Sequence, residues 1–143
     1  MIRRIASCLM ALTLIAALHS CRDLPEIGEF AGQWQVLSIE YPDGHTDDPH
    51  GTIYYSFYRS VAQLSATGYV RIHGNLTYDE GKSFTIQFPH LDAAQVAAWG
   101  IIVPDDVDSQ ADGWTEHFTI QNLSEEHLRF TTSQGVILTC RKY

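Results

Sequence analysis

From about residue 30 onward, short runs of apolar and aromatic residues recur along the chain, separated by Gly, Asp, Pro and Asn. Runs rich in Tyr, Phe, Ile, Val and Thr between such residues are typical of strands ended by turns. The pattern predicts eight strands, at Gln33–Glu40, Thr52–Arg59, Val61–Ala66, Tyr69–Tyr78, Lys82–Phe88, Trp114–Leu123, His127–Thr132 and Val136–Lys142. Most of the links between them are of hairpin length, so we expect consecutive strands to be antiparallel neighbours in an up-and-down sheet.

Alternation with a period of two is clearest in the second half of the chain, where apolar side chains share one face of each predicted strand. These side chains are Phe84, Ile86, Phe88, Phe118, Ile120, Leu128, Phe130, Val136, Leu138 and Cys140. The intervening positions are mostly polar, so one face should line an interior while the other faces water. A lone cysteine on the inward face is usually a small core residue, although a cysteine paired with a histidine can be a nucleophile.

A helix over Ala93–Trp99 is predicted in the long link between the fifth and sixth strands. Asp92 is a suitable N-cap residue, and Gly100 supplies the left-handed stop. A helix this short is not stable alone, so Val96 and Trp99 should dock on the sheet. The link runs for about twenty-five residues, and links of that length are usually lids or binding segments. We therefore expect it to cover one end of the domain.

The first twenty-one residues have the pattern of a lipoprotein export signal. Arg3 and Arg4 precede an apolar segment, Ile5–Leu18, and Leu18-His19-Ser20-Cys21 has the form of a lipobox. Cys21 is therefore the predicted site of lipidation with palmitate-type acyl chains. Cys8 precedes the apolar segment and would be removed with the signal. A transmembrane helix is the alternative, but about fourteen apolar residues fall short of the roughly twenty that span a bilayer.

These features predict a signal peptide over residues 1–20, a tether over 21–28 and one β domain over 29–143. After cleavage the chain carries seven basic and seventeen acidic residues, a formal charge of −10. Such a surface argues against binding to nucleic acid or to anionic lipid, so the lipid at Cys21 should be the membrane contact. Arg22, and not Asp, follows Cys21, which favours the outer membrane. Cys140 would keep the one free thiol, which excludes an intramolecular disulfide and a cysteine-rich zinc site.

Gly32-Gln33-Trp34, at the start of the first predicted strand, is similar to the Gly-x-Trp signature of lipocalins. Arg141 in the last strand stands where that family places an Arg that packs on the Trp, although alternation puts Arg141 on the face opposite Cys140. Together with the export signal, the chain resembles the lipocalin-like domains of unknown function of Bacteroidetes cell-envelope lipoproteins. The resemblance implies an all-β, eight-stranded antiparallel barrel of lipocalin-like or calycin-like form with a ligand cavity, and it carries over no particular ligand. The helix between the fifth and sixth strands departs from true lipocalins.

Three groups of side chains could carry chemistry, and each has a simpler interpretation. The loop with Asp43, His45, Asp47, Asp48 and His50 could bind a metal, but no helix or strand spacing fixes those ligands, so a solvated loop is favoured. The loop Asp105–Asp112 lacks the ligand spacing of an EF-hand and is also expected to be a solvated loop. Tyrosines could form a binding platform, although core packing is favoured; they are Tyr54, Tyr55, Tyr58, Tyr69 and Tyr78.

No catalytic, metal or cofactor motif stands out, so the leading hypothesis is a non-enzymatic envelope protein whose barrel binds a small hydrophobic or amphipathic molecule. Candidate ligand-binding residues at the mouth are Val96, Trp99, Glu116, Tyr55 and Tyr69. Glu116 shares its face with Phe118, as a ligand-anchoring carboxylate would, or it sits at the open rim. The alternative hypothesis is a protein-interaction module, an inhibitor or a subunit of an envelope complex, whose barrel interior is filled.

Overall fold

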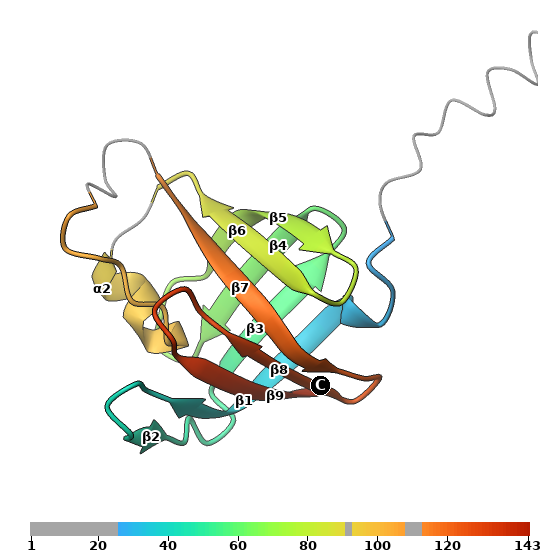
Figure 1. Cartoon of the computed structure of the whole chain (residues 1–143), viewed down its shortest axis with the longest axis horizontal. Helices are drawn as coiled ribbons and strands as arrows, with labels where there is room; N and C mark the ends of the chain where they lie inside the picture. The colour runs from blue at the N-terminus through green and yellow to red at the C-terminus, as the bar shows by residue number, and fades with distance from the viewer. Residues whose placement is uncertain (1–25, 91–92, 108–112) are drawn as a thin grey trace, which may run out of the picture.

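The computed structural model describes residues 26–90, 93–107 and 113–143, and their strands form a closed antiparallel barrel (Figure 1). Eight strands pair in chain order, and the last pairs with the first to close the barrel. They are β1 (Gly32–Glu40), β3 (Ile53–Tyr58), β4 (Val61–Ala66), β5 (Ile72–Asp79), β6 (Ser83–Phe88), β7 (Trp114–Leu123), β8 (His127–Thr131) and β9 (Ile137–Lys142). The predicted all-β, eight-stranded up-and-down barrel with a helix before its sixth strand is confirmed.

Two details of the strand pattern differ from the prediction. A two-residue strand, β2 (Thr46–Asp47), extends the sheet beside the end of β1. The predicted strand Tyr69–Tyr78 begins too early, because the Tyr69 amide donates a hydrogen bond to the Ala66 carbonyl at 3.1 Å and continues the turn. Gly68 in that turn has a φ of +85°, a left-handed conformation that glycine adopts without strain.

The barrel interior is a column of aromatic rings. Phe30 stacks on Phe57 with ring centroids 4.2 Å apart, and Phe84 stacks on Phe118 at 4.4 Å. Phe130 continues the column as an edge-on neighbour of Phe118 at 5.5 Å. All five rings are at most 1% exposed. Ring pairs of this geometry add to the free energy gained from burial, so the column is a major part of the core.

The predicted inward face is confirmed, and all of its side chains are buried except Ile120, which is half-buried. Ile120 continues the alternation of Glu116 and Phe118 and packs against the core, but it also lines a cleft at the base of the barrel, which leaves it partly exposed. A β-bulge follows it, between Ile120 and Asn122, and shifts the register of β7 against β8.

The interior has no room for a methyl group at Gly74, on the inward face of β5. A Cβ atom there would lie 2.4 Å from Ile86 Cγ2 and 3.0 Å from the Gln87 carbonyl oxygen. Separations this short force a displacement of neighbouring atoms in a close-packed core. At this level the barrel is filled by side chains, one of the two states that an eight-stranded barrel can adopt.

A 3₁₀ helix, η1 (Gly28–Phe30), closes the base of the barrel and inserts Phe30 into it. The Trp34 indole N–H donates a hydrogen bond to the Phe30 carbonyl at 2.9 Å. The Lys142 ammonium lies 4.1 Å from the centroid of the Trp34 ring and donates hydrogen bonds to the carbonyls of Glu29 and Ala31. Lys142 and Trp34 therefore hold η1 on the barrel: each donates hydrogen bonds to carbonyls in or beside η1, and a cation–π contact joins the two side chains.

The expectation that Arg141 packs on Trp34 is wrong, because Lys142 occupies that place. In the register of β1 and β9, Trp34 is opposite Lys142 and Gln35 is opposite Arg141. Arg141 points outward, where its Nε donates to Gln35 Oε1 at 2.8 Å. Alternation from the inward Cys140 requires this arrangement, since the next inward position is Lys142.

Candidate binding site at the helix-capped end

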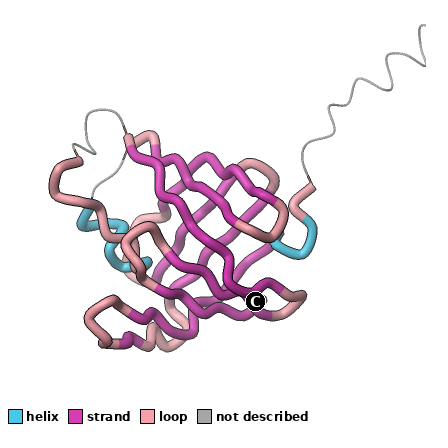
Figure 2. Tube along the Cα trace, in the orientation of Figure 1, coloured by secondary structure: helices cyan, strands magenta, loops and turns pink. Residues whose placement is uncertain are grey.

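The end of the barrel opposite η1 is covered by a short helical segment, α2 (Ala93–Val96) and η2 (Ala97–Trp99), which we call the helical cap. Figure 2 shows η1 and the cap at opposite ends of the barrel. The cap ends at Gly100, with a φ of +74°, as the sequence predicted. Asp92, the predicted N-cap residue, lies outside the described residues. Val96 and Trp99 are fully buried, so they dock on the barrel as expected.

Hydrogen bonds and close packing tie the cap into the core. The Trp99 indole N–H donates to the Ser65 carbonyl at 3.2 Å, and the buried Tyr55 hydroxyl donates to the Trp99 carbonyl at 2.7 Å. At Gly100 a Cβ atom would lie 3.0 Å from Ile39 Cγ2 and 3.2 Å from Val136 Cγ1. The chain therefore passes against the barrel rim with no space for a side chain. The cap is a packed element of the core and not a loose cover.

Glu116 is fully buried on the inward face of β7, opposite Ile86 of β6, and does not lie at an open rim. Its Oε1 accepts hydrogen bonds from the amides of His117, at 3.0 Å, and Ser133, at 2.8 Å. Its Oε2 has no hydrogen-bond partner among the residues that the structure describes. Burial raises the pKa of the Glu116 carboxyl, and the two amide donors oppose part of that rise.

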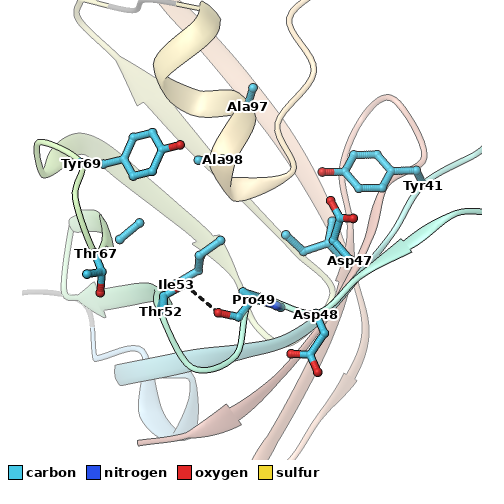
Figure 3. A pocket seen from close by; sticks show the side chains of 12 residues that line it. Tyr41, Asp47, Asp48, Pro49, Thr52, Ile53, Thr67, Tyr69, Ala97 and Ala98 are labelled. Carbon is cyan, nitrogen blue, oxygen red and sulfur yellow. Dashed lines mark hydrogen bonds between the residues drawn. The ribbon is translucent and has the colours of Figure 1, made fainter.

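A cleft of about 400 Å³, which we call the rim cleft, lies between the cap and the segment that joins β1 to β3 (Figure 3). On one side it is lined by the cap and the β4–β5 turn, through Ala97, Ala98, Ala66, Thr67 and Tyr69. On the other side it is lined by the end of β1 and the following loop, through Ile39, Tyr41, Asp47, Asp48, Pro49, Thr52 and Ile53. The cleft therefore combines apolar walls with hydroxyl and carboxylate groups at its edge.

The charge around the rim cleft is negative. Asp47 and Asp48 contribute carboxylates, and none of its lining residues is Lys, Arg or His. Burial raises the pKa of the Tyr41 phenol, and the neighbouring Asp47 carboxylate raises it further. The Tyr41 ring also stacks on His45 with centroids 4.2 Å apart, which orients it from outside the cleft.

Two further clefts open on the outside of the barrel. One, of about 440 Å³, lies at the base beside Glu26, Glu29 and Glu80. The other, of about 590 Å³, lies over the wall formed by β1 and Arg141. Of these three clefts, the rim cleft is bordered by the helical cap.

The predicted ligand-binding residues separate into two groups. Val96, Trp99 and Tyr55 are sealed inside, and Glu116 is buried near the same end, so none of these four lines the rim cleft. Tyr69, which is 56% exposed, lines the cleft and meets the Trp99 ring edge-on at 5.9 Å. Sequence reasoning missed Tyr41 as part of a site. It considered Asp47 and Asp48 as possible metal ligands in a solvated loop and not as part of this site, because nothing local places that loop beside the cap.

The five tyrosines do not form a binding platform, because they lie in different environments. Tyr55 is inside the barrel, Tyr58 and Tyr69 are exposed near opposite ends of β3 and β4, and Tyr78 stacks on Phe30 at 4.5 Å near the base. Tyr54 meets Tyr143 edge-on at 5.2 Å on the outer wall. Core packing, part of the favoured interpretation, accounts for Tyr55 and Tyr78.

In the loop after β1, each histidine pairs with its own aspartate: His45 with Asp43, and His50 with Asp48 at 3.5 Å. Within residues 26–90, 93–107 and 113–143, no group of three or more potential ligands converges on one point. In the loop Asp105–Asp112, which is expected to be solvated, Asp105 and Asp106 are exposed, and residues 108–112 lie outside the described ranges.

Cys140 is fully buried, and burial raises the pKa of its thiol well above the usual range. A thiol in this state is a poor nucleophile, as expected of a core cysteine. The predicted signal and Cys21 lie outside the described residues. Among those that are described, no helix has the length and apolarity to cross a bilayer.

A family model described as a lipocalin-like domain matches residues 14–143. A lipocalin-like protein from Bacteroides uniformis has a similar structure, with a TM-score of 0.56 and 23% identity over 81% of this chain and 100% of that chain. An uncharacterized protein from Bacteroides eggerthii is similar with a TM-score of 0.54 and 20% identity over 79% of this chain and 98% of that chain. Comparison with curated proteins gives no match. At these identities the two structures support the fold alone.

Proposed function

Because the chain belongs to the lipocalin-like domain family, we propose that it is a lipid-anchored envelope protein that binds a small amphipathic molecule at the helix-capped end of its barrel. The rim cleft is the observation that carries this proposal. Its volume of about 400 Å³ is within the usual range for small-molecule sites, and it pairs apolar walls with a few polar groups. Binding, and not catalysis, is proposed, since the Cys140 thiol is sealed in the core.

The site proposed here is at the rim and not inside the barrel. Aromatic rings fill the interior, and a methyl group at Gly74 would already collide with Ile86. A ligand inside would have to displace the cap together with the fully buried Trp99. Binding in the rim cleft needs no such rearrangement.

The position of the site relative to the predicted anchor favours access from the aqueous side. The described chain begins at Glu26, next to η1 and at the end of the barrel opposite the cap (Figure 1). A lipid at Cys21 would hold the η1 end toward the membrane, and the rim cleft would then face away from it. We place the protein in the outer membrane on the argument from Arg22.

A second candidate function is a protein-interaction module, which the filled interior favours. Exposed apolar side chains occur near the cap: Tyr69 is 56% exposed, Val70 79% and Ile102 41%. Aromatic residues such as Tyr are enriched in protein interfaces. In this case the same end of the barrel would bind a polypeptide.

Native mass spectrometry of the protein purified from its own envelope distinguishes the two functions, because a small molecule and a polypeptide add different masses. Ala97→Trp should fill the rim cleft from an exposed position of the cap. Ala93→Trp is the matched control, exposed on the same cap but outside the cleft lining.

We expect a small molecule on the unmodified protein and on Ala93→Trp, and its loss from Ala97→Trp. Equal retention by both variants would refute the rim cleft as its site. A bound polypeptide in place of a small molecule would favour the second function.

A further inference from the structure

We propose that the rim cleft selects an amphipathic amine, holding its ammonium group between the carboxylates and tyrosine hydroxyls and its hydrocarbon part on the apolar wall. This inference rests on the proposed function and adds the chemical class of the ligand. Two observations support it: the volume of the rim cleft, and the carboxylate and hydroxyl groups at its edge.

The charge of the cleft favours a cation. Asp47 and Asp48 are both in its lining, which contains no Lys, Arg or His, and the pairing of Asp48 with His50 outside the lining leaves Asp47 as the carboxylate nearest Tyr41. The chain as a whole has seventeen acidic and nine basic residues, so its long-range field adds to the local one. A carboxylate, sulfate or phosphate head group would meet repulsion in the same place.

The hydrogen-bonding groups favour an ammonium with its protons. Figure 3 shows the hydroxyls of Tyr41 and Tyr69 pointing toward each other across the cleft, with the Asp47 carboxylate beside Tyr41. An ammonium has three donors and no acceptor, whereas carboxylates and phenol oxygens accept. A hydrogen bond in which both partners are charged is stronger than a neutral one, so a primary amine is preferred over a sugar hydroxyl.

The apolar part of the ligand has a defined place. Ala97 and Ala98 of the cap lie opposite Ile53 at the start of β3 (Figure 3). Ala66, the last residue of β4, also lines the cleft. The small alanine side chains leave space beside the cap that a larger residue would occupy. An alkyl or aryl group on this wall would bury apolar surface on both sides, so the ligand should be amphipathic and not a simple cation.

Three probes with the same six-carbon chain test the head-group preference: hexylammonium, hexanoate and hexyl glucoside. Binding is measured by calorimetry on the full lipid-anchored protein in phosphatidylcholine nanodiscs, with empty nanodiscs as the blank. We expect hexylammonium to bind more tightly than hexyl glucoside, and hexanoate to show no binding.

Matched variants then assign the effect to the cleft. Asp47→Asn should weaken hexylammonium binding by about threefold to tenfold, the range expected for an exposed charge-assisted contact, and leave hexyl glucoside unchanged. Asp79→Asn removes the same charge from the far end of β5, next to the β5–β6 turn, and should change neither. Tyr69→Phe should also weaken hexylammonium binding, and Tyr58→Phe, an exposed tyrosine at the opposite end of the β3–β4 hairpin, should not.

Equal affinities for hexylammonium and hexyl glucoside, or an unchanged affinity in Asp47→Asn, would overturn the amine preference and leave the proposed function standing. Absence of binding by all three probes would overturn it as well. The proposed function itself fails if Ala97→Trp retains the co-purified molecule, or if a polypeptide is bound in its place, so the two failures are distinguishable.

Discussion

Replacing Trp99 by alanine should destabilise the whole barrel, because the structure makes the helical cap part of the core. The Trp99 side chain is fully buried, and its indole N–H is hydrogen-bonded to the Ser65 carbonyl at 3.2 Å. The substitution removes the ring, leaves a cavity and takes a donor from a strand carbonyl. Each of these changes acts on the folded state.

The expected cost is about 3–5 kcal/mol, the range for large aromatic residues replaced by alanine in packed cores. We expect the upper half of that range, since the lost hydrogen bond adds about 1 kcal/mol. Domains are stable by about 5–15 kcal/mol, so this is a large fraction of the total. The midpoint of thermal unfolding should fall by roughly 10–20 °C for a domain of this size.

The assay is urea unfolding followed by far-ultraviolet circular dichroism, with Trp114→Ala as the control. Trp114, at the start of β7, is only half-buried, so its replacement should cost less than half as much. If Trp99→Ala leaves the urea midpoint within error of the unmodified protein, the cap is a loosely docked cover. The cap would then not seal the barrel interior, contrary to what we infer from the burial of Trp99.

Lys142→Met should lower the free energy of unfolding by about 1–2 kcal/mol, because it removes the contact with Trp34. Lys82 is exposed, so Lys82→Met, the control, should lower it by less than about 0.5 kcal/mol. Equal urea midpoints for the two variants would contradict the role of Lys142. Because burial raises the pKa of Glu116, its carboxyl contributes stability below the unfolded-state pKa of about 4.3, and this is lost as the pH rises through the folded-state value. Glu116→Gln should therefore gain stability relative to the unmodified protein as the pH rises above about 4.3, and a pH-independent difference in urea titrations would count against this. Cys21→Ser should leave unprocessed precursor or release the protein from membranes, as immunoblots of membrane and soluble fractions would reveal; unchanged retention would mean that Cys21 is not the anchor.

The barrel and its helix could be predicted from the sequence because each rests on local rules. Side chains alternate across a strand, so Phe84 and Phe118 identify the inward face without knowledge of their partners. Gly100 likewise ends the helix by its own conformational freedom. Ile120 obeys the same alternation but is only half-buried, because it borders a cleft at the base of the barrel.

The site could not be predicted in the same way, because it depends on a loop far away in the sequence. The rim cleft needs Tyr41 and Asp47 to lie beside the cap, more than forty residues later in the chain. His50, with a φ of +51°, and Gly51, with a φ of +75°, turn this loop back into β3, and no local sequence signal predicts that path.

The ligand is proposed to bind in the rim cleft, outside a filled barrel. Hydrogen–deuterium exchange of the protein with its co-purified molecule, and after removal of that molecule, distinguishes this position from one inside the barrel. We predict that the ligand slows amide exchange in residues 46–53 and in the cap around Ala97 and Ala98. Amide exchange in β6 and β7, whose inward side chains fill the barrel, should not change. Slower exchange in β6 and β7 together with faster exchange in the cap would contradict the account, because it would place the ligand inside the barrel after displacement of Trp99.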